Sequence, residues 1–178
     1  DALNEGRIRL PATLDRLTGG RVELGLGAGA FWDGIAAMGG PRWTPMEALA
    51  ALEDALRLCR LLFEAAGTGE PVTYAGRLFR VQELAFGPRP VRPIPLWVGA
   101  IRPRALRLTG MLADGLTIST PYVPPERLPE VNRLVDEGAR AAGRDPQSIR
   151  RLYNLLGVLN VPGARPLRVN RPGFLSGP

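Results

Sequence analysis

The loop that follows residues 96–98 has the pattern of a binding site for an anion. Leucine, tryptophan and valine at these positions indicate a short, buried parallel strand. Gly99 and Ala100 come next, and such small residues let a ligand approach the backbone closely. Pro103 is typical of the first turn of a helix, where free N–H groups and the helix dipole favour a negative charge. The pattern predicts a phosphate site, or else an ordinary turn between a strand and a helix.

Four arginines lie in or near this loop. Arg102 and Arg104 flank the predicted start of the helix, and Arg92 and Arg107 are close in sequence. The planar guanidinium group binds phosphate and carboxylate through paired hydrogen bonds. These arginines therefore favour an anionic ligand, whereas the alternative interpretation leaves them as solvated surface residues.

A second candidate loop contains three glycines, Gly25, Gly27 and Gly29, at the end of a predicted strand. Their spacing does not match the G-x-G-x-x-G fingerprint of dinucleotide sites. The stretch about 20 residues further on is predicted to be helical, so the acidic residue that completes the fingerprint is missing as well. A tight turn explains two of the glycines. Close approach to a flat ring could explain the third.

Phe31 and Trp32 follow these glycines in a predicted loop, where they either line an apolar substrate pocket or simply pack against neighbours. Asp33 is the only acid in this loop. It could relay a proton, although capping the N-terminus of a following turn is the favoured role. Trp97 lies on a predicted interior strand and is expected in the core.

The composition restricts the chemistry that the chain can perform. All 23 basic residues among its 178 residues are arginines, and histidine is absent. The commonest general base and the commonest metal ligand are therefore missing. This excludes Ser-His-Asp and Cys-His catalysis within the chain, and no metal site is expected. The single cysteine, Cys59, is predicted to be a small core residue. Chemistry would then depend on a bound cofactor.

Charge and hydropathy argue against two further classes of protein. The net charge is +6, but the arginines are dispersed along predicted amphipathic helices without a basic tract, which argues against nucleic-acid binding. No apolar run reaches the roughly 18 residues that a membrane span requires. The first ten residues lack the layout of a signal peptide, so a cytoplasmic location is expected.

Helices and strands are predicted to alternate along the chain. The clearest helix start is a capping box, in which Thr44 is the N-cap, a proline follows and Glu47 comes third. Leu10, Leu14 and Leu17 share one face of an earlier helix. The predicted elements are helix 10–18, strand 21–26, helix 44–66, hairpin 72–81, strand 96–98, helix 103–113, strand 116–119, helix 125–142 and strand 152–161.

This alternation is typical of parallel βαβ units, so the predicted fold class is α/β. In such folds ligands bind where the strands end. The four predicted ends are Gly27 to Phe31, Gly99 to Arg104, Ser119 to Tyr122, and Asn160 onward.

Three segments resemble the luciferase-like monooxygenase family, and more narrowly its members that use the deazaflavin coenzyme F420. The family's fourth-strand segment is similar to residues 14–42, LDRLTGGRVELGLGAGAFWDGIAAMGGPR. Its fifth strand and cofactor-phosphate loop are similar to residues 93–115, PIPLWVGAIRPRALRLTGMLADG. The approach to its seventh strand is similar to residues 141–150, AAGRDPQSIR. Together the resemblance covers about residues 12–161.

The resemblance implies part of a TIM-type (β/α)8 barrel, roughly strands 4 to 7 with their helices. It implies a flavin- or deazaflavin-dependent oxidoreductase that acts on a small organic substrate by hydride transfer or monooxygenation. The implied cofactor is coenzyme F420, with FMN as the alternative. No catalytic residue is identified, and Phe31 and Trp32 would line the substrate pocket. The implied cofactor-binding residues are Gly27, Ala28, Gly29, Gly99, Ala100, Ile101, Arg102 and Arg104.

The resemblance also implies an incomplete barrel. A full barrel takes about 250 residues, whereas residues 1–161 would form a partial barrel domain and residues 162–178 an irregular tail. The alternative function is a catalytically inactive, truncated barrel that only binds the cofactor or associates with another chain. Open sheet edges predict either a homo-oligomer or pairing with the missing barrel half.

Overall fold

The computed structural model describes residues 2–156, with side chains from residue 9 onward. The predicted tail at 162–178 and the predicted strand end at Asn160 lie outside these residues. The helices and strands are, in chain order, α1 (Ala2–Leu17), β1 (Leu24–Gly27), α2 (Trp32–Ala37), α3 (Pro45–Ala65), β2 (Val72–Ala75), β3 (Arg80–Leu84), β4 (Leu96–Gly99), α4 (Pro103–Leu112), β5 (Gly115–Ser119), α5 (Leu128–Ala141) and β6 (Arg150–Asn154).

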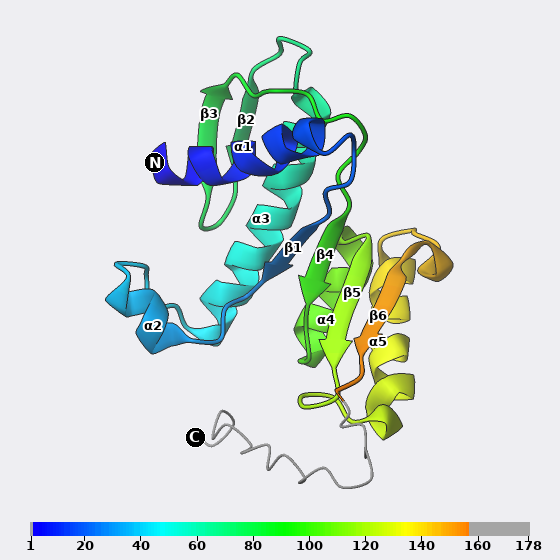
Figure 1. Ribbon diagram of the computed structural model, residues 1–178. Coiled ribbons are helices and arrows are strands. Elements are labelled where there is room, and N and C mark those ends of the chain that lie inside the picture. The colour runs from blue at the N-terminus through cyan, green and yellow to red at the C-terminus, as the bar shows by residue number, and fades with distance from the viewer. Residues whose placement is uncertain (1, 157–178) are drawn as a thin grey trace, which may run out of the picture.

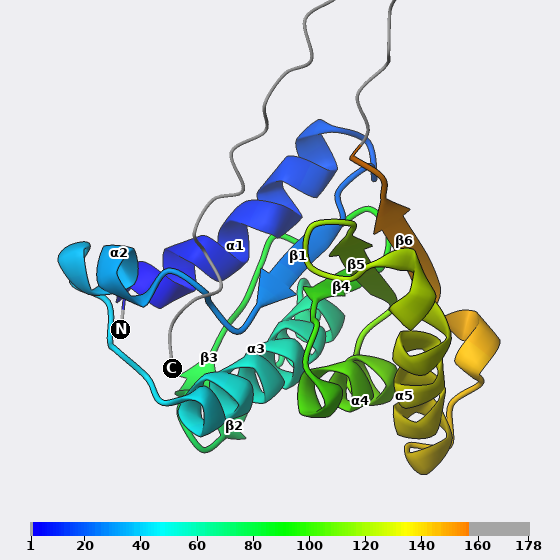
Figure 2. The ribbon, with the colours of Figure 1, turned by 90° about the horizontal axis from the view of Figure 1, so that it is seen from below.

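Four strands form one parallel sheet in the order β1-β4-β5-β6. Helices α3, α4 and α5 cover one face of this sheet, whereas α1 lies beyond β1, on the side away from β4 (Figures 1 and 2). Because all four strands run in the same direction, their carboxyl ends meet at one edge. The predicted α/β class with parallel βαβ units is confirmed.

The two faces of the parallel sheet carry different residue types. Leu96, Val98, Leu116 and Ile118 are buried in the core between the sheet and the helices. The residues that alternate with them point to the opposite face, which we call the inner face. From β1 to β6, the inner face consists of Gly25, Gly27, Trp97, Gly99, Gly115, Thr117, Ser119, Arg150, Leu152 and Asn154.

Contacts across the inner face support this assignment. A Cβ atom added to Gly115 would lie 2.3 Å from the ring of Trp97, so the two residues point the same way. The side-chain amide of Asn154 donates a hydrogen bond to the Thr117 hydroxyl at 3.2 Å. In the part of the chain that the structure describes, no helix covers this face (Figure 2). Trp97 is half-buried there, so the prediction of a core position is only partly met.

Helix α3 begins as predicted. The backbone N–H of Glu47 donates to the Thr44 hydroxyl at 3.3 Å, and the Glu47 carboxylate accepts the backbone N–H of Thr44 at 2.8 Å. This capping box satisfies two N–H groups that a helix start otherwise leaves without partners. Further along the helix Cys59 is buried in the core, and burial raises the pKa of its thiol to about 11. The prediction of a core cysteine is confirmed.

The β2–β3 hairpin closes around a buried carboxylate on α3. Asp54 accepts hydrogen bonds from the backbone N–H groups of Leu78 at 2.6 Å and Phe79 at 3.0 Å, and from the Tyr74 hydroxyl at 2.9 Å. Burial and the bond to Asp54 raise the pKa of Tyr74 to about 12. A Cβ atom on Gly76 would lie 2.4 Å from the Asp54 carboxyl group, so the turn fits tightly over it.

Helices α4 and α5 cross at two glycines. A Cβ atom on Gly138 would lie 2.0 Å from the carbonyl oxygen of Arg107, and one on Gly110 would lie 2.0 Å from the carbonyl oxygen of Val135. Real Cβ atoms do not approach other atoms this closely. The glycines therefore set the distance between the two helices.

Helix α1 buries a different face from the one that its leucines predict. Leu10, Leu14 and Leu17 share one face, as expected, but they are 56%, 41% and 78% exposed, respectively. The buried positions are Pro11, Ala12 and Asp15 instead. The apolar stripe of α1 therefore contributes nothing to the core of this chain.

Polar contacts hold α1 in place. The Asp15 carboxylate accepts the backbone N–H groups of Val22 at 3.2 Å and Val91 at 2.8 Å. Arg9 donates to the carbonyl oxygen of Gly87 at 3.1 Å. These bonds tie the helix to the segment before β1 and to the proline-rich segment before β4.

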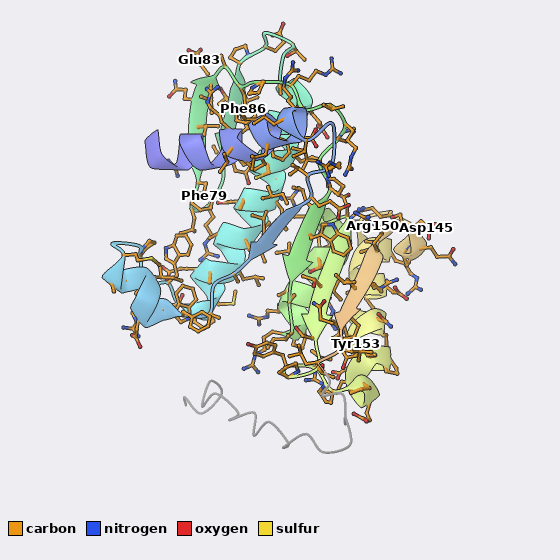
Figure 3. The ribbon with its side chains drawn as sticks, in the orientation of Figure 1. Phe79, Glu83, Phe86, Asp145, Arg150 and Tyr153 are labelled. Carbon is orange, nitrogen blue, oxygen red and sulfur yellow. The ribbon has the colours of Figure 1, made fainter. Side chains whose placement is uncertain are left out.

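Strand β6 is displaced from its predicted position. It runs from Arg150 to Asn154, whereas the prediction covered residues 152–161. The strand begins with two adjacent arginines, and each of them has a partner. Arg150 lies over the ring of Trp97 at 4.6 Å, and Arg151 pairs with Asp136 on α5. Arg150 and Tyr153 mark the two ends of this strand in Figure 3.

Candidate functional site

The two predicted ligand loops lie side by side at the carboxyl edge of the sheet. β1 and β4 are neighbours, and Gly27 pairs in register with Gly99. A Cβ atom on Gly27 would lie 4.0 Å from the Gly99 carbonyl oxygen, and one on Gly99 would meet nothing within 4 Å. Ala28 and Ile101, the next residues predicted to bind, are half-buried and pack against the core. Ala100 is buried. The backbone of both loops is thus fixed by the core, while the space beside Gly99 stays open.

The start of α4 can accept an anion. Arg102 is the N-cap residue, its side chain does not cap the helix, and Pro103 occupies the first turn. The first intrahelical bond runs from Leu106 N–H to the Arg102 carbonyl oxygen, which leaves the N–H groups of Arg104 and Ala105 free of backbone acceptors within the described residues. The first turn contains no acidic residue. Free N–H groups and the helix dipole together attract negative charge.

Only two of the four arginines near this loop lie at the carboxyl edge. The Arg102 side chain is exposed and forms no hydrogen bond or ion pair with any described residue. Arg104 donates to the Met46 sulfur at 2.7 Å, which turns it toward the start of α3. Arg107 pairs with Glu137 on α5 at 3.0 Å. Arg92 lies at the other end of the sheet, where it donates to the Gly20 carbonyl oxygen. The structure therefore separates Arg92 and Arg107 from the predicted site.

A flat ring does approach Gly29, and it belongs to the chain itself. Gly29 has a positive φ of 90°, which disfavours any other residue. A Cβ atom there would lie 3.2 Å from the indole ring of Trp32 and 3.3 Å from Ile35. Trp32 thus packs on the glycine loop of its own chain. Phe31 is 57% exposed beside it.

Helix α2 was missed in the sequence, where residues 31–33 were predicted as loop. It has only six residues, too few to show a helical period, and it lies to one side of the sheet beyond the end of β1 (Figure 1). The favoured N-cap role of Asp33 is wrong, because Phe31 occupies that position and Asp33 lies within the helix. The Asp33 carboxylate accepts a hydrogen bond from Arg42 at 2.6 Å, and both side chains are largely exposed.

The ends of β5 and β6 are joined by hydrogen bonds that the sequence did not reveal. The Thr120 hydroxyl donates to the Asn154 carbonyl oxygen at 3.1 Å and accepts the Leu156 N–H at 2.9 Å. Tyr122, 48% exposed, follows in the same loop. On the inner face below, the Thr117 hydroxyl and Asn154 amide form the polar pair described above. No spacing rule links residues 37 positions apart, so this pair could not be found from the sequence.

Several ion pairs lie at the amino edge of the sheet. Arg150 donates to Glu23 at 2.9 Å across the inner face, and this bond holds the pKa of the Glu23 carboxyl below its usual value. Asp114 accepts the Leu96 N–H at 2.8 Å and pairs with Arg60 at 2.8 Å. In barrel folds this end serves stability, whereas ligands bind at the carboxyl end.

Other features of the described residues add no competing site. A shallow cavity of about 330 Å³ lies on the β2–β3 hairpin, between Thr73 and Glu83, away from the carboxyl edge. No cluster of His, Cys, Asp or Glu suited to a metal ion occurs among residues with described side chains. Within the same range, no helix has the length and apolar character needed to cross a membrane.

Comparison with known proteins gives a consistent result. The sequence model of the family described as luciferase-like monooxygenase matches residues 10–159. The chain is 31% identical over 134 residues to the F420-dependent glucose-6-phosphate dehydrogenase of Nakamurella multipartita, covering 75% of the chain and 38% of that protein. It is 32% identical over 151 residues to the F420-dependent hydroxymycolic acid dehydrogenase of Mycobacterium tuberculosis, covering 83% of the chain and 39% of that protein. The chain therefore spans about two fifths of the length of these curated relatives.

Solved structures share the fold. An F420-dependent secondary alcohol dehydrogenase, in complex with an F420-acetone adduct, superposes with a TM-score of 0.72 at 26% identity. The match covers 82% of this chain and 43% of that one. The coenzyme F420-dependent tetrahydromethanopterin reductase of Methanopyrus kandleri gives a TM-score of 0.63 at 26% identity, over 80% and 43% of the two chains. The prediction of an α/β fold that corresponds to part of a luciferase-like barrel is confirmed.

Proposed function

Because this chain belongs to the luciferase-like monooxygenase family, we propose that it provides the cofactor-phosphate half of an oxidoreductase barrel. The proposed cofactor is coenzyme F420, with FMN as the alternative, and the proposed substrate is a small organic molecule. Support for F420 comes from relatives and neighbours whose names specify this coenzyme. A riboflavin lyase whose structure contains a modified FMN shares the fold, and FMN is therefore kept as the alternative cofactor to test.

The residues at the carboxyl edge fit the acidic part of such a cofactor. The free N–H groups of Arg104 and Ala105 and the guanidinium of Arg102 would bind the phosphate group. Gly99 leaves open space beside the β4 end, and Ala100 and Ile101 hold the loop against the core. Gly27, Ala28 and Gly29 would lie along the rest of the cofactor on the neighbouring strand.

The cofactor would supply hydride transfer or the activation of dioxygen, neither of which the side chains of this chain can perform alone. The chain's own residues would bind and orient it. Arg102 would neutralise the negative charge of the phosphate group. Because β1 and β4 end in glycines, no side chain from these two positions enters the space above the inner face. Trp32 and Phe31 on the β1 side would offer apolar contacts to a substrate. The α4 N-terminus, with free N–H groups, a free arginine and no acid in its first turn, is the observation that carries this proposal.

Replacing Arg102 by glutamine is expected to weaken cofactor binding about 10-fold, because a charge-assisted hydrogen bond contributes roughly 1.5 kcal/mol. The measurement is a titration of the purified chain with F420 and, separately, with FMN, followed by the absorbance and fluorescence of the cofactor. At least one cofactor should bind the unmodified chain at high micromolar concentration.

Arg107→Gln is the matched control, since this arginine lies one helical turn further along α4 but pairs with Glu137. Its affinity should stay within about twofold of the unmodified chain. Equal loss in both variants, or no binding of either cofactor, would overturn the proposed site.

A second candidate function is favoured by the absence of histidine from the sequence. The chain would then bind the cofactor without turnover, as an inactive partial barrel or as one component of a larger assembly. Binding with no detectable oxidation or reduction of the cofactor, across several alcohol and aldehyde substrates, would select this candidate.

A further inference from the structure

The side chain of Arg104 is bound to a thioether sulfur instead of a carboxylate. Its guanidinium donates to the Met46 sulfur at 2.7 Å. The first turn of α4 contains no acidic residue, and within the described part of the chain Arg104 forms no ion pair. Thioether sulfur is a weak hydrogen-bond acceptor. This bond therefore sets the direction of the Arg104 side chain without neutralising its charge.

The capping box of α3 fixes the position of Met46. Met46 lies in the first turn of the helix, between Pro45 and Glu47. The Glu47 carboxylate accepts the backbone N–H and the hydroxyl of Thr44 at 2.8 and 2.7 Å, so it is already bound to the N-cap residue. In Figure 1, α3 begins at the end of the molecule to which the strand arrows point, as α4 does. The sulfur is thus the group of α3 that meets Arg104 at the carboxyl edge.

The Met46 side chain is 47% exposed, so a peroxide in solution can reach its sulfur. In the reaction, one peroxide oxygen is transferred to the sulfur. An S–O bond forms as the O–O bond breaks, the sulfur is oxidised by two electrons, and the peroxide is reduced to water. The sulfoxide oxygen carries partial negative charge and accepts hydrogen bonds more strongly than the thioether did. Methionine sulfoxide reductases reverse the oxidation.

We propose that Met46 is a site of reversible oxidation, and that its sulfoxide withdraws the Arg104 guanidinium from the anion-binding start of α4. In the reduced chain, the weak bond to sulfur allows Arg104 to turn toward an anion beside Arg102. In the oxidised chain, the sulfoxide oxygen retains Arg104. The effect on cofactor binding rests on the proposed function, whereas the effect on Arg104 itself does not. Loss of one charge-assisted hydrogen bond to the anion should weaken cofactor binding about 10-fold.

The test begins with oxidation of the purified chain by hydrogen peroxide, which is then removed. Mass spectrometry of peptides measures oxygen addition at each of the three methionines. The single cysteine, Cys59, is buried and does not compete for the oxidant.

Two measurements follow on the reduced and the oxidised chain. Phenylglyoxal, which modifies free guanidinium groups, reports the availability of Arg104 without any cofactor. Its reaction with Arg104 should slow about 10-fold after oxidation and recover after treatment with methionine sulfoxide reductases. Titration with F420 and with FMN should show the same loss and recovery of affinity.

Met46→Leu removes the sulfur at similar side-chain volume, so the start of α3 should be retained. In this variant peroxide should no longer change the labelling of Arg104. Met38→Leu is the matched control, because Met38 is 82% exposed and follows α2 as its C-cap residue. This variant should keep the full response. Labelling of Arg102 is an internal control and should not change on oxidation.

Several results would overturn the proposal. These are no oxidation of Met46 at a peroxide dose that oxidises Met38, unchanged labelling of Arg104 once Met46 is oxidised, and an equal response in Met46→Leu. Cofactor affinity that oxidation of Met46 leaves unchanged would overturn it as well. If oxidation suppresses the labelling of Arg104 but neither cofactor binds the reduced chain, the proposed function fails and Met46 still stands as the oxidation site that controls Arg104.

Discussion

The Gly138→Ala variant is expected to lose at least about 2 kcal/mol of unfolding free energy, and the helix pair α4–α5 should separate. The added Cβ atom would lie 2.0 Å from the Arg107 carbonyl oxygen and 2.7 Å from its carbonyl carbon. These are backbone atoms in the middle of α4, so they cannot move without moving the helix. Overpacking of this kind typically costs about 1–3 kcal/mol or more, which exceeds the roughly 1 kcal/mol that alanine gains over glycine in a helix. Urea denaturation followed by circular dichroism measures the loss.

Gly34→Ala is the matched control for this variant. Gly34 lies within α2, and its added Cβ atom would meet Phe31 at an ordinary 3.9 Å. Alanine there should be neutral or slightly stabilising because of its higher helix propensity. If Gly138→Ala proves as stable as Gly34→Ala, the close crossing of α4 and α5 is not a feature of the folded chain.

The Asp54→Ala variant is expected to lose about 3 kcal/mol and to detach the β2–β3 hairpin from α3. The change removes the acceptor of three hydrogen bonds and leaves the N–H groups of half-buried Leu78 and Phe79 without a partner. A lost bond to a charged acceptor and the unsatisfied donors both reduce stability. Glu53→Ala is the control. Its exposed ion pair with Arg57 should contribute less than about 1 kcal/mol.

The same carboxylate should make stability depend on pH. Burial raises the pKa of Asp54, but the hydrogen bonds from Leu78, Phe79 and Tyr74 outweigh it and hold the pKa below its usual value. Because the folded pKa is lower than the unfolded one, the contribution is fully present above the ordinary aspartate pKa of about 3.9 and is lost as the pH falls through the folded value. Asp54→Asn should remove this part of the acid dependence. An unchanged slope between pH 5 and pH 2.5 would contradict the assignment.

Elements with strong local signals were predictable from the sequence. Thr44 and Glu47 fix the start of α3 through their own side chains, and no distant residue is needed. The strand at 96–98 and the helix after Pro103 have similarly local causes, an apolar run and a proline at the first turn. The hairpin was also found, although β3 extends to Leu84 rather than residue 81.

Features that depend on distant partners were not predictable. The leucines of α1 look like a buried stripe, yet the burial of this helix is decided by Asp15, whose partners Val22 and Val91 lie in two other segments. Strand β6 begins at two arginines because Trp97 and Asp136 receive them. In each case the residue type alone suggests the wrong environment, because the environment depends on a partner that is distant in sequence.

The candidate site also combines local features, which the sequence predicts, with contacts to distant residues, which it does not predict. The sequence predicts that Gly27 and Gly99 end two strands, and the register of the sheet then brings them together. It does not distinguish the free Arg102 from Arg107, which is bound by Glu137. It also gives no indication that Arg104 turns toward Met46 or that Trp32 covers Gly29. Whether these loops bind a cofactor stays a prediction.

The separation of charged and glycine-containing residues between the two ends of the sheet has a consequence for how this chain can evolve. The loops Gly99–Arg104 and Thr120–Tyr122 share no hydrogen bond with the ion pairs around Asp114 and Glu23. Substitutions in these loops can therefore accumulate without breaking the contacts that hold the amino ends of the strands. New ligand preferences can therefore arise at one rim while the opposite rim preserves the architecture.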